Sequence, residues 1–496
     1  MRIAFVQEEL YSYMGFMYLG AIAKGMQHEV EVFVAAVTDS IVQDVAGFKS
    51  DIICFTTTTP HYMFTRDMAR KFRVSLPESF ILLGGWHPTF SPKILEEKSF
   101  DALCLGEGEI PFKIFLESYP DKKKMKKIPN FHVKIDGQIC KNPISNLVDN
   151  LDTIAFPDRS VYYDKYCILR NQYTKSFIVG RGCPNPCTYC FNEGMKNIYK
   201  GKGKYVRFRS PENIAEEINL VRKEYPMKYV QFLDDTFNSN KKWLFSFLDY
   251  YKREVGLPFL CLCRIERLDE ETVIKMKEAG LDRVGFAIEQ GNEQYRKETL
   301  RRYMKNSEIV EGCRILSKHG VRFHVSNMVG LPGETLNMAF ETLKINQQIK
   351  PSFTQIYLFQ PYKGTQITQM AKERGYIDAN YDEECLTGHS SWRTDNVKLT
   401  SIVNSKDIKQ MINLRSFFSL LVKYPFMFPL VKPLLSLQPN KYYELIPTWY
   451  FLKVRFKYSA NIHEKYDLML QLAKIFFSKR LHMIFKKVKG LVLNGD

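Results

Sequence analysis

The chain has 496 residues and is 45% hydrophobic, more than one hydrophobic core usually organises, so we expect two or three domains. Its net charge is +17, and residues 401–496 carry +11 of it, with 16 Lys and Arg against 5 Asp and Glu. The eleven cysteines are scattered, which excludes a secreted disulfide scaffold and favours a reducing cytoplasm. No run of eighteen apolar residues occurs, so no membrane-spanning helix is predicted, and the first residues read as a strand rather than a signal peptide.

The first part of the chain alternates short apolar runs with helical stretches such as residues 15–24 and 62–74. Strands are expected at residues 3–6, 30–34, 51–55, 80–83 and 102–105. This alternation predicts a parallel sheet covered by helices on both faces. Ligands of such sheets bind beyond the carboxyl ends of the strands, so the residues that follow each run are candidate contacts. They are Thr57 after the third run, Gly84, Gly85 and His87 in Gly-Gly-Trp-His-Pro-Thr after the fourth, and Gly106 and Glu107 in Gly-Glu-Gly-Glu after the fifth.

This layout resembles the flavodoxin-like or Rossmann-like cobalamin-binding domain that precedes many radical S-adenosylmethionine (SAM) barrels, and the resemblance covers about residues 1–145. It implies cobalamin as a cofactor, with the candidates above as its contacts. The Asp-x-His-x-x-Gly motif whose histidine ligates cobalt in other cobalamin proteins is absent from this stretch, which implies a cobalt without a histidine beneath it. His61 and His87 are candidate contacts, with loop packing as the alternative. For the whole domain, the alternative is a flavodoxin-like sheet that binds another ligand or none.

A hairpin and a connector follow this domain. Residues 131–143 contain Lys-Ile-Asp-Gly-Gln, which predicts a hairpin turn. Residues 146–174 form the linker, and its stretch 150–159, which ends in Pro-Asp-Arg, is expected to be extended. The resembling proteins join their two domains through a connector of the same kind.

Three cysteines then lie within eight residues, in Cys183-Pro-Asn-Pro-Cys187-Thr-Tyr-Cys190. Four cysteines would saturate a [4Fe-4S] cluster for electron transfer, so three leave one iron open for chemistry. The spacing, with an aromatic residue before the third cysteine, resembles the cluster motif of the radical SAM enzymes. In that family SAM binds the open iron, and one electron from the cluster cleaves it to a 5′-deoxyadenosyl radical. The alternative is a structural zinc site with a fourth ligand elsewhere, although no second Cys-x₂-Cys pair follows.

Six further apolar strands are expected, and amphipathic helices separate them. They span residues 176–180, 229–233, 259–263, 283–289, 322–329 and 354–360. Six such units predict a partial (β/α)₆ barrel over residues 175–375, with its site in the loops that follow the strands. The family resemblance implies these contacts there: Tyr189 against adenine, Arg209 with a carboxylate, Asp234 and Asp235 at the SAM amino group, Glu289 at the ribose and methionyl end, and Gly330 and Pro332 beside adenine.

Two more cysteines sit in the third of these strands. Cys261 and Cys263 alternate along it, so both face the same side, and two ligands are too few for a second cluster. We expect them to be barrel-lining or core residues. Arg264, at the end of the same strand, is a candidate to face the site.

Residues 376–496 are predicted to form a mostly helical cap that recognises the substrate. Prolines at 425, 429 and 433 rule out one long helix across the apolar stretch 416–437. Residues 474–489 interleave lysines with apolar side chains, which indicates a basic amphipathic helix. We expect it to cover the open edge of the barrel, with peripheral contact to a membrane surface as the alternative. No nucleic-acid recognition motif is present, so no nucleic-acid partner is predicted.

Together these resemblances imply a cytoplasmic enzyme that uses a [4Fe-4S] cluster, SAM and cobalamin to methylate an unactivated carbon. An electron donor such as flavodoxin or ferredoxin is implied, and the substrate is open between a small molecule, a lipid and a peptide. The alternative reaction is cyclisation or oxidation without methyl transfer. A non-enzymatic cobalamin sensor would not need the three cluster thiolates.

Overall fold

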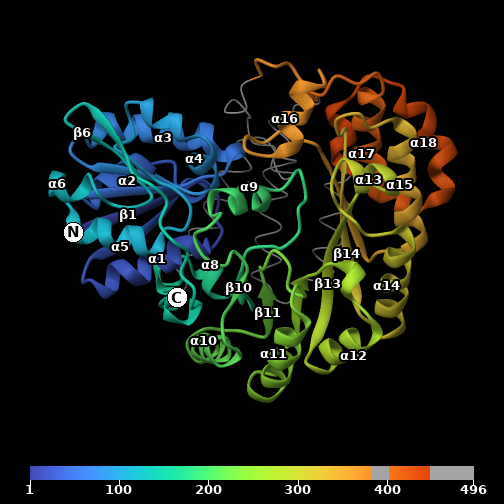
Figure 1. The fold of residues 1–496 in the computed structure, drawn as a ribbon, viewed down its shortest axis with the longest axis horizontal. Helices are drawn as coiled ribbons and strands as arrows, with labels where there is room; N and C mark the ends of the chain where they lie inside the picture. The colour runs from blue at the N-terminus through green and yellow to red at the C-terminus, as the bar shows by residue number, and fades with distance from the viewer. Residues whose placement is uncertain (382–400, 447–496) are drawn as a thin grey trace.

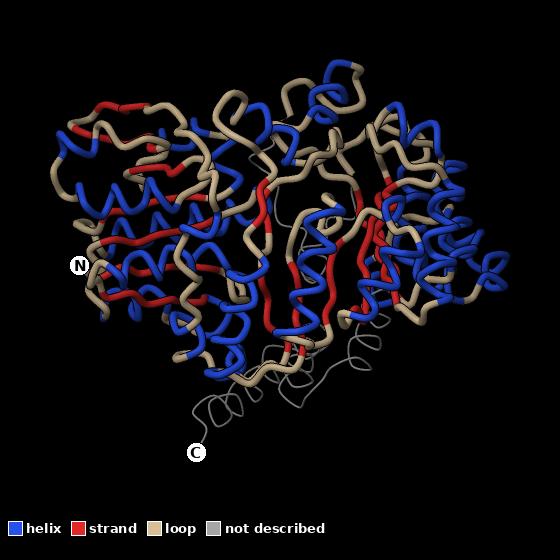
Figure 2. The backbone as a smooth tube through the Cα atoms, turned by 60° about the horizontal axis from the view of Figure 1, so that its bottom comes forward, coloured by secondary structure: helices blue, strands red, loops and turns tan. Residues whose placement is uncertain are grey.

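A computed structural model of the chain describes residues 1–381 and 401–446. An N-terminal α/β unit lies beside a larger second unit, and helices near the end of the described chain cover the far side of that unit (Figure 1). Figure 2 shows the strands of the first unit running toward the second unit, whose own strands cross them at a steep angle. The predicted architecture, an α/β domain with a mostly parallel sheet followed by a partial barrel of parallel strands, is confirmed.

The N-terminal unit is built on a seven-stranded sheet of order β2-β1-β3-β4-β5-β6-β7. The first five strands are parallel, and the hairpin of β6 and β7 adds antiparallel to the edge. The order 2-1-3-4-5 is that of flavodoxin-like folds, whose ligands bind where the strand order reverses. The five strands predicted for this unit are correct to within about one residue at each end, and the hairpin predicted within residues 131–143 supplies the other two strands of the sheet. They are β1 (Arg2–Gln7), β2 (Glu29–Val34), β3 (Ile52–Thr56), β4 (Phe80–Gly84), β5 (Ala102–Cys104), β6 (Phe131–Ile135) and β7 (Gln138–Lys141).

Helices cover both faces of this sheet because successive residues of each strand point to opposite sides. In β1, Phe5 packs on one face, where its ring stacks on Phe16 at 4.6 Å, while Ala4 and Val6 belong to the core of the other face. The helices are α1 (Met14–Gly25), α2 (Ile41–Gly47), α3 (Tyr62–Ser75), α4 (Trp86–Phe90), α5 (Glu109–Ser118) and α6 (Lys122–Met125). The carboxyl ends of the strands face the second unit (Figure 2).

Apart from a 3-10 turn at Leu151–Thr153, the linker stretch 150–159 has no helix or strand, as expected for an extended connector, and the rest of the linker is partly helical. It contains the short helices α7 (Ser160–Tyr163) and α8 (Cys167–Arg170). Tyr162 is fully buried and donates its hydroxyl to Gln7, and the Tyr166 hydroxyl donates to the Val32 carbonyl at 2.9 Å. These tyrosines anchor the linker in the core of the first unit.

The second unit is a six-stranded parallel sheet in which consecutive strands are neighbours, as expected for a partial barrel. Its strands are β8 (Thr174–Phe177), β11 (Tyr229–Phe232), β12 (Phe259–Leu262), β13 (Leu281–Glu289), β14 (Arg322–Val329) and β15 (Phe353–Leu358). The helices between them are α10 (Pro211–Glu224), α11 (Lys241–Glu254), α12 (Glu270–Glu278), α13 (Glu293–Glu298), α14 (Asn306–Lys318) and α15 (Leu336–Ile349). A short antiparallel ribbon, β9 (Gly180–Arg181) with β10 (Arg207–Phe208), leads into and away from the mouth of the barrel.

Cys261 and Cys263 lie side by side on β12, with their sulfurs 3.6 Å apart. Both are buried in the core that the strands form with the surrounding helices. The expectation that both are barrel-lining or core residues is confirmed, since both belong to the hydrophobic core.

The last described helices pack against the final strand of the barrel. They are α16 (Gln366–Glu373), α17 (Ile408–Lys423) and α18 (Phe428–Leu435), and the apolar face of α17 buries against α15 and β15. The predicted break near the prolines is confirmed, since α17 ends at Lys423 and α18 follows as a separate helix. The predicted basic helix at 474–489 lies outside the described residues. Across residues 1–381 and 401–446, no helix has both the length and the apolar character needed to cross a membrane.

Candidate active site at the mouth of the barrel

The three motif cysteines lie in the loop between β9 and α9 (Phe191–Ile198), at the carboxyl end of the barrel strands. Cys183 and Cys187 are buried and Cys190 is half-buried, and all three are unoxidised thiols. Within the described ranges, no three His, Cys, Asp or Glu side chains come together as the ligands of a single metal ion would. In a cubane cluster each sulfur binds a different iron, so the three sulfurs stand farther apart than the ligands of one ion.

Polar groups point at these sulfurs. Asn185 Nδ2 and Thr236 Oγ1 are each 3.2 Å from Cys183 Sγ, and Arg264 Nη1 is 3.9 Å from Cys187 Sγ. Hydrogen bonds of this kind stabilise thiolates and tune iron–sulfur clusters. Burial raises the pKa of Cys190 to about 11, so a thiolate there needs a positive charge beside it, which iron supplies when it is bound. The loop therefore fits a [4Fe-4S] cluster, and the expectation that Arg264 faces the site is confirmed.

A hydrogen-bonded group joins the cysteine loop to the end of β13. The Tyr189 hydroxyl donates to Glu289 Oε1 at 3.0 Å, and Arg302 Nη1 lies 3.4 Å from the same hydroxyl. Burial raises the pKa of Glu289, while the nearby Arg302 opposes that shift. Glu289 has a φ of +70°, an uncommon value for a non-glycine residue, so the backbone turns sharply at the point where the strand meets the site. Arg302 gave no signal in the sequence.

The two aspartates that follow β11 have different surroundings. Asp234 is buried and accepts hydrogen bonds from the backbone N–H groups of Val179 at 3.0 Å and Gly180 at 2.6 Å. Its burial raises its pKa to about 7. Asp235 is exposed and accepts a hydrogen bond from the Asn192 side chain, next to the cysteine loop. The geometry therefore favours Asp235 over Asp234 as the carboxylate that meets a ligand.

The turn after β14 is held from inside by Glu334. Gly330 has a φ of +74°, and the buried carboxylate of Glu334 accepts from the Leu331 N–H at 2.9 Å and from Gln290 Nε2 at 2.8 Å. The Tyr295 hydroxyl donates to the Pro332 carbonyl at 2.7 Å. Gly330 and Pro332 thus belong to a rigid turn at the same edge as the cysteine loop.

Burial raises the pKa of Glu334 from 4.5 to about 7, which links stability to pH. The folded state then binds more protons than the unfolded state between these values, so stability falls as the pH rises through this window. We expect the wild type to lose up to about 3 kcal/mol more than Glu334→Gln between pH 5 and pH 8. Urea unfolding at the two pH values checks this, with the exposed Glu373→Gln as the control. Equal losses in all three proteins would contradict it.

Arg209 pairs with a carboxylate of the protein itself rather than with a cofactor. It is 5% exposed and donates to Glu217, which also accepts from Arg159 at 2.8 Å. It donates further to Asn213 Oδ1 at 2.7 Å. Arg209 therefore ties the start of α10 to the linker, and its assignment to the cofactor is corrected.

Two of the candidate contacts in the N-terminal unit are buried. His87 is 2% exposed, stacks on Tyr62 with a centroid distance of 4.3 Å, and has its Nδ1 3.1 Å from Thr59 Oγ1. Thr57 is 3% exposed and accepts a hydrogen bond from Thr65 Oγ1 at 3.1 Å. These positions favour loop packing for His87 and an internal role for Thr57. His61 lies beside Glu8, with its Nδ1 3.0 Å from Glu8 Oε2.

The glycine pair after β4 shapes the end of that strand. Gly85 has a φ of +101°, and a Cβ at this position would lie 2.6 Å from the Thr57 carbonyl oxygen. We expect Gly85→Ala to destabilise the unit by about 2 kcal/mol or more, because both the backbone conformation and the space require glycine. Gly15→Ala is the control, since nothing lies within 4 Å of a Cβ there. Thermal unfolding compares the two variants, and equal melting temperatures would contradict the requirement.

The edge of the sheet offers apolar surface to a ligand. Trp86 after β4 and Ile110 after β5 are 38% and 48% exposed, both at the carboxyl ends of the strands. Gly84 leaves ordinary space at the end of β4, whereas Tyr199 covers Gly106, and Glu107 reaches across to the barrel and pairs with Arg207. Exposed apolar side chains at the carboxyl ends of a parallel sheet suit a large flat macrocycle, so this edge fits a corrin.

Fold and site together define a two-unit α/β protein with a three-cysteine loop where the units meet. The chain matches the Radical SAM superfamily over residues 177–345 and the B12 binding domain over residues 6–116. It is 27% identical to an uncharacterised methyltransferase of Pyrococcus horikoshii, over 72% of this chain and 78% of that one. It is 25% identical to cytidylyl-2-hydroxyethylphosphonate methyltransferase of Streptomyces wedmorensis, over 68% of each chain.

Among solved structures, the cobalamin-dependent S-adenosylmethionine radical enzyme OxsB, with aqua-cobalamin and S-adenosylmethionine bound, has the same fold. The TM-score is 0.67 at 14% identity, and the match covers all of this chain and 76% of that one. The chain therefore contains a radical SAM domain over residues 177–345, and a B12-binding domain precedes it. Its cofactors are a [4Fe-4S] cluster, SAM and cobalamin.

Proposed function

We propose that this protein is a cobalamin-dependent methyltransferase that adds a methyl group to an unactivated carbon. One observation carries the proposal: α9, which follows the cysteine loop, packs directly on α4 of the B12-binding domain, the short helix after β4. The ring of Phe191 lies 5.9 Å from that of Trp86 and 5.3 Å from that of Phe90. The two relatives named above are both described as methyltransferases, which agrees with transfer rather than cyclisation.

When bound, the cluster and SAM supply a radical that abstracts hydrogen, and cobalamin supplies the methyl group. The residues of the chain hold the cofactors and the substrate in position and exclude water from the site. Asp235 places a carboxylate where it can pair with the ammonium group of SAM, and Tyr189 and Glu289 fix the cysteine loop against β13. Phe191 also packs on Tyr362, with a centroid distance of 5.2 Å, and this aromatic layer keeps water from the space between the two cofactor regions.

The partners in this proposal are an organic substrate and an electron donor. Reductive cleavage of SAM consumes one electron per event, which a flavodoxin or a ferredoxin provides. The substrate is a small molecule, a lipid or a peptide with an unactivated C–H bond. The cysteine loop contacts the end of the first sheet through Phe191 and Trp86, so we place the substrate site where the two units meet.

Anaerobic turnover with methyl-deuterated SAM, in extracts of the source cell, tests the proposal. We expect one metabolite to gain the labelled methyl group and Cys187→Ala to produce none. A product that gains no label while 5′-deoxyadenosine accumulates would favour the cyclase or oxidoreductase alternative. An ultraviolet–visible spectrum of the reconstituted protein without corrin bands would contradict cobalamin dependence.

A further inference from the structure

Four charged residues connect the two units next to the cysteine loop. Arg207 on β10 pairs with Glu107 on the loop after β5. Arg181 on β9 lies 3.3 Å from Glu107 and pairs with Glu109 at the start of α5. We call Glu107, Glu109, Arg181 and Arg207 the interdomain charge cluster.

This charge cluster is largely removed from water. The side chain of Arg207 is 3% exposed, those of Glu109 and Arg181 are 12% and 18% exposed, and that of Glu107 is 23% exposed. Although burial alone would raise it, the pKa of Glu109 is lowered by Arg181. Arg207 also donates to the Val148 carbonyl of the linker at 2.7 Å. The charge cluster therefore joins all three parts of the chain.

Backbone contacts fix the same loop. The Glu107 N–H donates to the Tyr199 hydroxyl at 2.8 Å, and Asn130 Nδ2 donates to the Glu107 carbonyl at 3.1 Å. Gly106 has a φ of +73°, and a Cβ there would lie 2.1 Å from the Tyr199 hydroxyl oxygen. The Tyr199 side chain thus packs directly against Gly106, and any residue larger than glycine at position 106 would collide with it.

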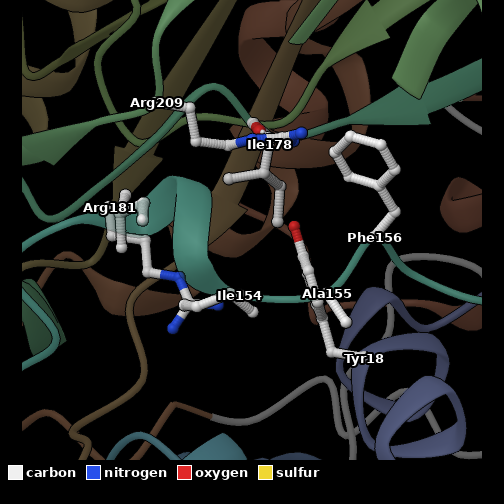
Figure 3. A pocket seen from close by; sticks show the side chains of 8 residues that line it. Tyr18, Ile154, Ala155, Phe156, Ile178, Arg181 and Arg209 are labelled. Atoms are coloured by element: carbon white, nitrogen blue, oxygen red, sulfur yellow. Dashed lines mark hydrogen bonds between the residues drawn. The ribbon is translucent and has the colours of Figure 1, made fainter. Parts of the chain in front are cut away.

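The partners of this loop bracket the cysteines along the chain. Arg181 is two residues before Cys183, and Tyr199 directly follows α9, the helix that begins after Cys190. Figure 3 shows Arg181 at the small pocket where Tyr18 of the first unit, Phe156 of the linker and Ile178 of the barrel meet. The corrin-facing loop and the segment that carries the cysteines are therefore held to each other at both ends.

Buried ion pairs of this kind add little net stability, because replacing them with well-packed apolar residues is often neutral or stabilising. Such ion pairs fix the geometry instead, because a planar guanidinium can donate to both oxygens of a carboxylate in only a few arrangements. Arg207 meets both oxygens of Glu107, one of them at 3.2 Å.

Resting on the proposed function, we infer that Arg181 and Arg207 are positioning residues that order the loop of residues 105–110 and thereby set the corrin relative to the cluster. Neither arginine touches the cysteine sulfurs within the contacts described above. They act through the loop, and their loss disturbs the first unit's ligand edge without removing a cluster ligand.

Hydrogen exchange and corrin binding of the full chain, with its cluster reconstituted, test this inference. In Arg207→Met and in the isosteric Glu107→Gln, we expect amides of residues 105–110 to exchange about tenfold faster, and hydroxocobalamin to bind about tenfold more weakly. Arg207→Lys should show part of the wild-type protection from exchange and part of the wild-type corrin affinity. It keeps the positive charge but cannot contact both oxygens of Glu107 as arginine does. Iron and sulfide content should stay at the wild-type level. Arg253→Met, which removes an exposed ion pair with Glu254, is the control.

A variant that melts at a lower temperature but retains wild-type exchange at 105–110 and wild-type corrin affinity would overturn the inference, since it would show a purely structural role. A wild type that binds no hydroxocobalamin would overturn the proposed function and the corrin part of the inference together. The two failures are distinguishable because the first appears only in the variants and the second in the wild type.

Discussion

Replacing Cys187 by alanine is expected to abolish both the iron–sulfur absorbance and the cleavage of SAM. Cys187 is buried in the loop, 3.9 Å from Arg264, and its two companions alone cannot hold three irons of a cubane. The loss of SAM cleavage should reach at least about a thousandfold, because the cluster delivers the electron on which every later step depends. Anaerobic assay of 5′-deoxyadenosine and iron content measures both effects.

The first unit should survive this substitution, because its core and the anchored linker do not involve the cysteine loop. Hydroxocobalamin binding by the variant measures that survival. Cys140→Ala, a half-buried cysteine on β7, is the matched control and should keep both cluster and activity. If Cys187→Ala still cleaves SAM, then Cys187 is not a required ligand of the cluster.

Replacing Glu289 by alanine should lower SAM cleavage by about a hundredfold, equivalent to about 2.7 kcal/mol. The substitution leaves the Tyr189 hydroxyl without its acceptor and removes one of the two carboxylates, Glu289 and Glu266, that stabilise the buried charge of Arg302. Tyr189 and Arg302 both lie against the cysteine loop, so their rearrangement misplaces SAM. Glu289→Gln keeps an acceptor oxygen and should lose only about tenfold.

Formation of 5′-deoxyadenosine at several SAM concentrations measures this effect and separates KM from kcat. Glu298→Ala, an exposed carboxylate on the following helix, is the control and should behave as the wild type. If Glu289→Ala keeps wild-type cleavage at every SAM concentration, then Glu289 has no part in holding SAM.

Local pattern was sufficient to predict most of the fold. The apolar runs that became β1 to β5 and the later barrel strands follow from residues that neighbour each other in sequence. The first barrel strand was predicted wrongly at residues 176–180. In the structure β8 ends at Phe177, and a separate strand, β9, begins at Gly180. The N–H groups of Val179 and Gly180 bond to Asp234, which lies 54 residues or more along the chain, and no local pattern reports such a partner.

In the candidate site, too, some residues could be predicted from the sequence and others could not. The three-cysteine loop could be recognised in the sequence because its three ligands lie within eight residues and their spacing resembles the radical SAM motif. The partner of Arg209 is Glu217 and that of Glu107 is Arg207, and neither choice is visible in a sequence where arginines and glutamates are common. The sequence indicates that a charged residue beside a buried strand end needs a partner of opposite charge. Only the folded structure identifies that partner.

The central claim is that the three thiolates hold a [4Fe-4S] cluster with one iron open to SAM. It is tested most directly by electron paramagnetic resonance of the reduced, anaerobically reconstituted protein before and after SAM is added, together with metal and sulfide analysis. We expect about four irons and four sulfides per chain, and a spectrum that changes when SAM binds. Zinc in place of iron, an absence of acid-labile sulfide, or a cluster spectrum indifferent to SAM would contradict the claim.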